Sequence, residues 1–196
     1  MVRRYFVAPS SLLVLVIAFC HAECCFSLDA KRVTAGLQVL YDFRDNGPVV
    51  KDRSGVGSPL NLRIADRNAV RRSAGSLEIQ SAVAIRSEGP ARKLVDAVKR
   101  SGELTIEAWI APASKSQSGP ARIVTLSKNT IERNFTLGQE NASFDIRLRT
   151  SSTDSNGLPS LATPNNSVGT KLTHVVYTRL RSGQANVYLN GKPVGR

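Results

Sequence analysis

The sequence predicts an all-β protein, a β-sandwich of antiparallel sheets with one short helix. About ten short stretches alternate between apolar and polar residues, and turns rich in glycine, asparagine and proline separate them. Only residues 90–102 carry apolar side chains at helical spacing. A chain of 196 residues, 41% hydrophobic, is long enough for one domain with its own core.

The first 22 residues predict an export signal. Arg3 and Arg4 precede an apolar run over residues 11–19, and small residues lead up to Ala22, after which we expect cleavage. An uncleaved membrane anchor is the alternative, but the run is well short of the roughly 20 residues that cross a bilayer. We therefore expect no membrane span in the mature chain, which would be secreted, periplasmic or held at the cell surface.

After the signal we expect a linker over residues 23–33 and one domain over residues 34–196. The three cysteines lie at positions 20, 24 and 25, before this domain, so disulfides do not stabilise the predicted fold. Cys24 and Cys25 either are inert or pair between chains.

The chain is strongly basic, with a net charge of +12. An exported basic protein meets acidic polysaccharides and envelope phosphates, which its field would attract, and it seldom meets nucleic acid. A solvated basic surface without a specific partner is the alternative.

The elements follow in order along the chain. We expect strands over residues 36–43, 60–64, 77–79 and 82–85, with loops over 44–59 and 66–74. Pro90 and Gly102 suit the two ends of the single helix. A central strand then places Leu104, Ile106, Ala108 and Ile110 on one face and Thr105, Glu107 and Trp109 on the other.

Further strands are predicted over residues 123–126, 134–138, 143–150, 172–180 and 184–189. In the third of these, Phe144, Ile146 and Leu148 should point inward, and Asp145, Arg147 and Arg149 outward. Residues 150–170 form a long polar loop, and Asn190-Gly191 is a hairpin turn.

Four groups of residues together resemble the LamG domain of the concanavalin A-like lectin/glucanase superfamily. They are Val39-Leu40-Tyr41-Asp42-Phe43 with Asp52-Arg53-Ser54-Gly55, then Leu104-Thr105-Ile106-Glu107-Ala108-Trp109-Ile110, His174-Val175-Val176-Tyr177 and Val187-Tyr188-Leu189-Asn190-Gly191. The resemblance implies a jelly-roll of two antiparallel sheets that binds glycans or proteins. It also implies further strands after the last hairpin, so the domain is expected to be C-terminally incomplete.

Glu103 and Glu107 are the candidates for catalysis. Glucanases of the superfamily that this chain resembles carry two catalytic glutamates on one strand with an aspartate between them, where this chain has Thr105. On a straight strand the two glutamates lie about 13 Å apart, whereas a retaining glycosidase needs about 5 Å. The sequence therefore favours a non-catalytic role.

Asp42 and Asp52 are the candidates for a metal site. Together with Asp45 and Asn46 they supply oxygen ligands of the kind that Ca²⁺ prefers. The resemblance also implies a structural Ca²⁺, and ordinary turn chemistry is the alternative.

The candidates for ligand binding are aromatic and basic. Trp109, beside Glu107, and Tyr177 offer ring faces to a sugar, although core packing would explain both aromatics. Arg147 and Arg149 offer a basic stripe to an acidic glycan. His174 has no second histidine or cysteine near it in the domain, so we expect a strand residue with a satisfied hydrogen bond.

The sequence thus predicts an exported, non-catalytic module that binds a carbohydrate or a cell-envelope or other protein partner. Two alternatives stay open at this point. One is a relic of a glucanase-type glycoside hydrolase, and the other is a structural segment of a larger, truncated exported protein.

Overall fold

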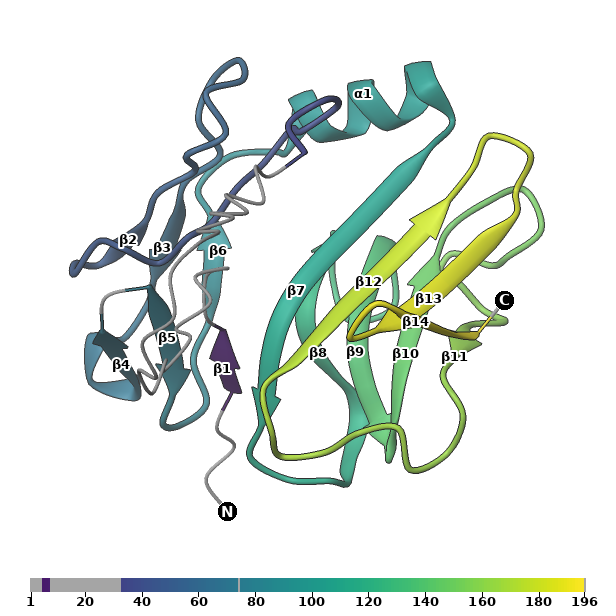
Figure 1. Cartoon of the computed structure of the whole chain (residues 1–196). Coiled ribbons are helices and arrows are strands. Elements are labelled where there is room, and N and C mark those ends of the chain that lie inside the picture. The colour runs from purple at the N-terminus through teal and green to yellow at the C-terminus, as the bar shows by residue number, and fades with distance from the viewer. Residues whose placement is uncertain (1–4, 8–32, 74, 196) are drawn as a thin grey trace, which may run out of the picture.

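The computed structural model describes residues 5–7, 33–73 and 75–195, and these form a predominantly β-sheet molecule with one α-helix (Figure 1). All strand pairs are antiparallel. The prediction of an all-β jelly-roll sandwich with one short helix is confirmed.

The largest sheet has seven strands in the order β14–β13–β12–β7–β1–β5–β4. Its strands are Lys192–Gly195, Ala185–Leu189, Thr173–Arg179, Leu104–Pro112, Tyr5–Val7, Ser76–Ile79 and Val70–Ser73 in that order. A second sheet, β11–β10–β9–β8, contains Leu161–Ala162, Ser143–Leu148, Arg133–Asn141 and Gln117–Ser127. A third, β2–β3–β6, contains Val49–Val50, Leu62–Ile64 and Ile85–Ser87.

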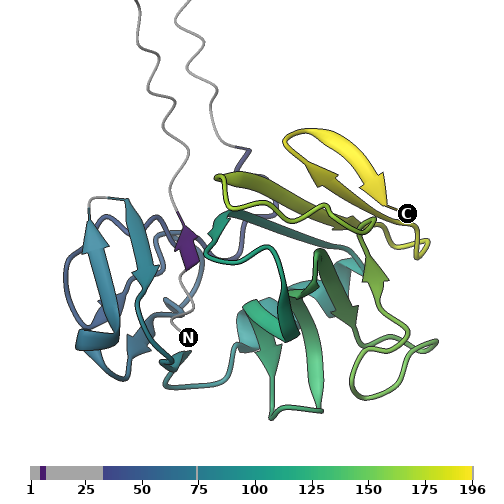
Figure 2. The same ribbon diagram turned by 90° about the horizontal axis from the view of Figure 1, so that it is seen from below.

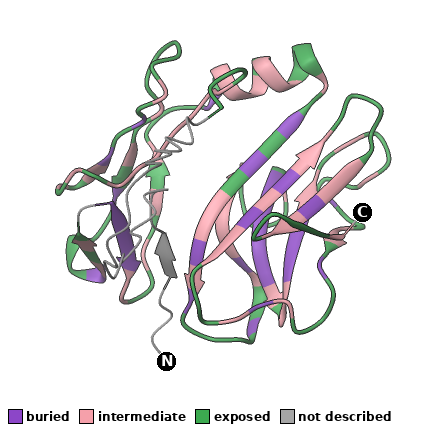
Figure 3. Cartoon of the chain, viewed as in Figure 1, coloured by how far each residue is buried: buried purple, intermediate pink, exposed green. Residues whose placement is uncertain are grey.

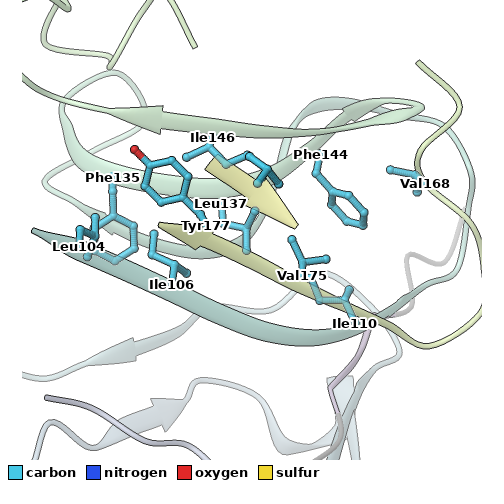
Figure 4. Close-up of a cluster of buried hydrophobic side chains, with 11 residues drawn as sticks. Leu104, Ile106, Ile110, Phe135, Leu137, Phe144, Ile146, Val168, Val175 and Tyr177 are labelled. Atoms are coloured by element: carbon cyan, nitrogen blue, oxygen red, sulfur yellow. The ribbon is translucent and has the colours of Figure 1, made fainter. Parts of the chain in front are cut away.

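The main core lies between the β7–β12–β13 part of the first sheet and the second sheet. Figure 4 shows Leu104, Ile106 and Ile110 of β7 facing Phe144 and Ile146 of β10, with side chains of β9 and β12 between them. Alternate residues of β7 are buried, as a strand with one face on a core requires (Figure 3). The predicted alternation in the central strand and the inward-pointing residues of β10 are therefore confirmed.

A smaller core lies in the first half of the chain. Val50, Ile64 and Leu77 pack together there, where β2 and β3 meet β5. Figures 1 and 2 show these strands on one side of β7, with the main sandwich on the other. Helix α1, Arg92–Ser101, connects the two parts and ends at Gly102, whose φ of 71° suits glycine.

Several sequence predictions were wrong in detail. Residues 36–43 form no ladder, because the Leu40 amide donates to the Asp52 carboxylate (3.1 Å), its carbonyl accepts from Arg53, and Phe43 has a φ of 54°. Residues 66–74, predicted as a loop, contain the 3₁₀ turn Arg67–Ala69 and strand β4. The strand expected over residues 82–85 begins instead at Ile85.

Strand β1 pairs with β5 on one side and β7 on the other. It belongs to the segment that the sequence predicts as an export signal, and the rest of that segment, like most of the predicted linker, lies outside the described residues. Cleavage after Ala22 would remove β1 and leave the facing edges of β5 and β7 without this partner. In the described residues, no helix is long and apolar enough to span a membrane.

Candidate functional site

Three side chains meet on the outer face of the β7–β12 pair, the face turned away from the main core. His174 Nε2 lies 2.9 Å from Glu107 Oε1, and the His174 and Trp109 rings are stacked, with centroids 4.5 Å apart and planes 14° from parallel. We call Glu107, Trp109 and His174 the outer-face triad. It combines an aromatic surface, a carboxylate and an imidazole on neighbouring strands.

The strand register produces this arrangement. His174 is the cross-strand partner of Trp109, and Val176 is the partner of Glu107, so Glu107 and His174 are diagonal neighbours on one face. The Asn190 side chain fixes the start of β12, because its Oδ1 accepts a hydrogen bond from the His174 amide at 2.9 Å. The triad therefore stands on paired backbone rather than on a loop.

The triad is partly exposed. The Glu107 side chain is 39% exposed and the His174 side chain 24%. The Trp109 indole N–H is buried and has no hydrogen-bond partner among the described residues. An unsatisfied buried donor costs about 1–3 kcal/mol.

A cavity of about 510 Å³ opens at the edge of the sandwich next to the start of β12. Thr173 and Asn190 line it, one adjacent to His174 in sequence and the other hydrogen-bonded to it. Lys115, Asn166 and Ser167 supply further polar groups. Amide and hydroxyl groups in this number suit a polar, hydroxyl-rich ligand.

Tyr177 does not offer a ring face to a ligand, which corrects the sequence prediction. It is 3% exposed and lies in the main core (Figure 4). Its cross-strand partner is Ile106, so the register places it on the core face of the sheet.

Arg147 and Arg149 do not form an exposed basic stripe either. The Arg147 side chain is only 13% exposed and donates to Asp145 at 2.8 Å, with Glu140 at 3.7 Å. The following loop packs closely on β10, because a Cβ at Gly157 would lie 2.8 Å from the Leu148 amide nitrogen. Arg149 is exposed but lies just beyond the end of β10, and Arg147 is paired with Asp145.

Asp52 and Asp42 already have partners. Asp52 accepts hydrogen bonds from the amides of Leu40, Ser54 and Leu60 and contacts Lys93 Nζ at 2.5 Å. Asp42 lies 3.2 Å from Arg44 and 3.3 Å from Arg53. Both carboxylates are therefore engaged by protein donors, and the described residues contain no cluster of three or more acidic, histidine or cysteine side chains that could hold a metal. Calcium binding stays a prediction.

Glu103 lies outside the triad. It precedes β7, is exposed, and its amide donates to the Ser101 hydroxyl at 3.0 Å. The structure instead pairs Glu107 with His174, a residue that sequence reasoning treated as a plain strand residue. The sequence alone could not predict this pair, because only the register between β7 and β12 brings Glu107 and His174, which are 67 positions apart in the chain, into contact.

The fold defines a β-sandwich domain. The chain belongs to the concanavalin A-like lectin/glucanases superfamily, because a Laminin_G_3 family model of that description matches residues 87–196, more than half of the chain. The match includes helix α1, the main sandwich and the triad. No curated protein and no solved structure matches the chain significantly.

Proposed function

We propose that this protein is an exported, non-catalytic module that binds a glycan through the outer-face triad. The observation that carries the proposal is the Trp109–His174 stack with Glu107 hydrogen-bonded to its edge. An aromatic surface with a few convergent polar groups is the usual chemistry of a small-ligand site. A saccharide offers C–H faces that can pack on the ring and hydroxyl groups that can bond to the carboxylate and the imidazole.

Two further observations support a saccharide. The buried indole N–H of Trp109 lacks an acceptor among the described residues, and a sugar hydroxyl would supply one. The cavity lined by Thr173 and Asn190 offers further hydroxyl and amide groups near the start of β12, although no residue of the triad lines it. Export rests on the predicted signal over residues 1–22 and would bring the module to extracellular or envelope polysaccharides.

A glycan array probed with the full chain tests the proposal. We expect binding that Trp109→Ala and Glu107→Gln weaken at least tenfold, which corresponds to about 1.4 kcal/mol. Thr105→Ala is the matched control, since Thr105 is exposed on the same strand and face. Trp109→Phe keeps an aromatic ring but removes the N–H, and it separates stacking from hydrogen bonding.

An empty array together with an empty pull-down from envelope extract would refute the binding proposal. Equal binding by wild type and the Trp109 variants would refute the site. Release of reducing sugar from a glucan panel, lost in Glu107→Gln, would instead make the protein a hydrolase.

A further inference from the structure

A second cavity lies in the first half of the chain, outside the region matched by the family model. It has a volume of about 200 Å³ and is lined by Asn46, Gly47, Arg67, Val70 and Arg72. Arg67 comes from the 3₁₀ turn and Arg72 from strand β4, which follows it directly. Two guanidinium groups therefore border one small cavity, with no carboxylate among its lining residues.

Arg72 is an incompletely paired cation. Its Nη1 donates to the carbonyls of Gly47 and Val49 at 3.0 and 3.1 Å. Its Nε and Nη2 are buried and have no hydrogen-bond partner in the part of the chain that the structure describes. Among the described residues, no carboxylate lies within ion-pair distance of Arg72.

The surrounding charges do not neutralise Arg72. Burial lowers the pKa of its guanidinium and outweighs the field of Asp45, which raises it. Asp45 itself is held by Arg53 at 2.8 Å and lies 3.8 Å from Lys51. The carboxylate near Arg72 is thus already shared between two other cations.

A buried charge without a counter-ion is costly, and buried polar groups in native proteins almost always have partners. Arginine presents a planar fork of N–H donors that matches the oxygens of sulfate and phosphate. Arg67 is exposed, and no ion pair of its side chain occurs in the described part of the chain, so it is available at the cavity mouth. Asn46, also exposed, adds an amide donor there.

We propose that this cavity binds a sulfate- or phosphate-type oxyanion, with the half-buried Arg72 as the inner cation and the exposed Arg67 as the cation at the entrance. The site is independent of the outer-face triad and goes beyond the glycan-binding function. The basic net charge of the chain favours the approach of such anions.

Isothermal titration of the full chain with sodium sulfate and with sodium phosphate, at ionic strength held constant with sodium chloride, tests this proposal. We expect saturable binding at one site per chain. Titration with glucose 6-sulfate and glucose 6-phosphate tests whether the site also accepts an anion that is carried on a sugar. Neutral glucose is the control and should not compete with sulfate or phosphate for the site.

Arg67→Ala should weaken oxyanion binding at least fivefold, and Arg72→Gln should abolish it. Arg86→Ala is the matched control, because Arg86 is an exposed arginine of β6 that does not line the cavity. Arg72 also donates hydrogen bonds to the carbonyls of Gly47 and Val49, so Arg72→Gln could fail to fold. In that case the binding measured for Arg67→Ala tests the proposal. The proposal is overturned if neither anion binds saturably, or if Arg67→Ala and Arg86→Ala weaken binding equally.

Discussion

Lys93 of helix α1 lies with its ammonium 2.5 Å from the carboxylate of Asp52, a residue 41 positions earlier in the chain. The Asp52 side chain is fully buried and that of Lys93 is 15% exposed. Lys93 also donates to the Val56 carbonyl at 2.8 Å. This contact ties the helix at the start of the main sandwich to the first half of the chain.

Removing either member of the Lys93–Asp52 ion pair should destabilise the fold strongly. Removing one member of a buried pair leaves an uncompensated charge and costs about 3–5 kcal/mol. We expect Lys93→Met to lower the free energy of unfolding by that amount in urea denaturation. Lys99→Met, an exposed lysine of the same helix, should change it by less than about 0.5 kcal/mol.

Stability should fall at acidic pH because of Asp52. Burial by itself would raise the pKa of this carboxyl, but the hydrogen bonds from the Leu60 amide, Lys93 and the Ser54 and Leu40 amides outweigh it and hold the pKa well below the ordinary value. The folded pKa is thus lower than the unfolded pKa of about 3.9, so this stabilisation is present above pH 4 and is lost as the pH falls below it. Urea midpoints measured from pH 6 to pH 2 should fall less steeply for Asp52→Asn than for wild type.

A pH dependence of the same slope in Asp52→Asn would assign the acid sensitivity to other carboxylates. Asp45→Asn is a suitable comparison, because Asp45 is a partly exposed ion-pair member in the same region.

The Trp109–His174 stack predicts a fluorescence signature. Trp109 is the sole tryptophan of the chain, so its emission reports directly on the outer-face triad. Removing the ring in His174→Ala should uncover one face of the indole and shift the emission maximum to longer wavelength. Thr105→Ala should leave the spectrum unchanged, and an unchanged spectrum in His174→Ala would contradict the stacked geometry.

Because β1 pairs with both β5 and β7, hydrogen exchange in those two strands should differ between the full chain and a chain that begins at residue 23. Phe6 is the register partner of Glu78 on β5 and of Ala111 on β7, so loss of β1 removes the partner of both strands. Hydrogen exchange at Leu77, Glu78 and Ala111 should then be faster in the shorter chain. Exchange at Val175 in β12, which pairs with β7 and β13, serves as the internal reference.

Equal exchange rates in the two chains would show that β1 contributes no protection there. Concentration-dependent protection of the shorter chain would instead indicate that the vacant strand position pairs with a second molecule.

Much of the fold could be predicted from local patterns. The alternation over residues 104–110 defines β7 because every second side chain must enter the core, and the helix follows from Leu94 and Val98 on one face with Gly102 at its end. Residues 36–43 misled the prediction, since their apolar spacing resembles a strand while their hydrogen bonds go to the Asp52 loop. Local spacing does not reveal where backbone hydrogen bonds go.

The sequence by itself determined the alternating strands, the helix, the hairpin turns and the membership of Trp109 and Glu107 in one face of a strand. Tertiary structure alone decided what these residues contact. The register of β7 against β12 joined His174 to the pair and buried Tyr177, and the packing of helix α1 gave Asp52 a lysine partner. The reason is physical: side-chain periodicity is a local property, whereas a contact between residues far apart in the chain depends on which strands pair and in which register.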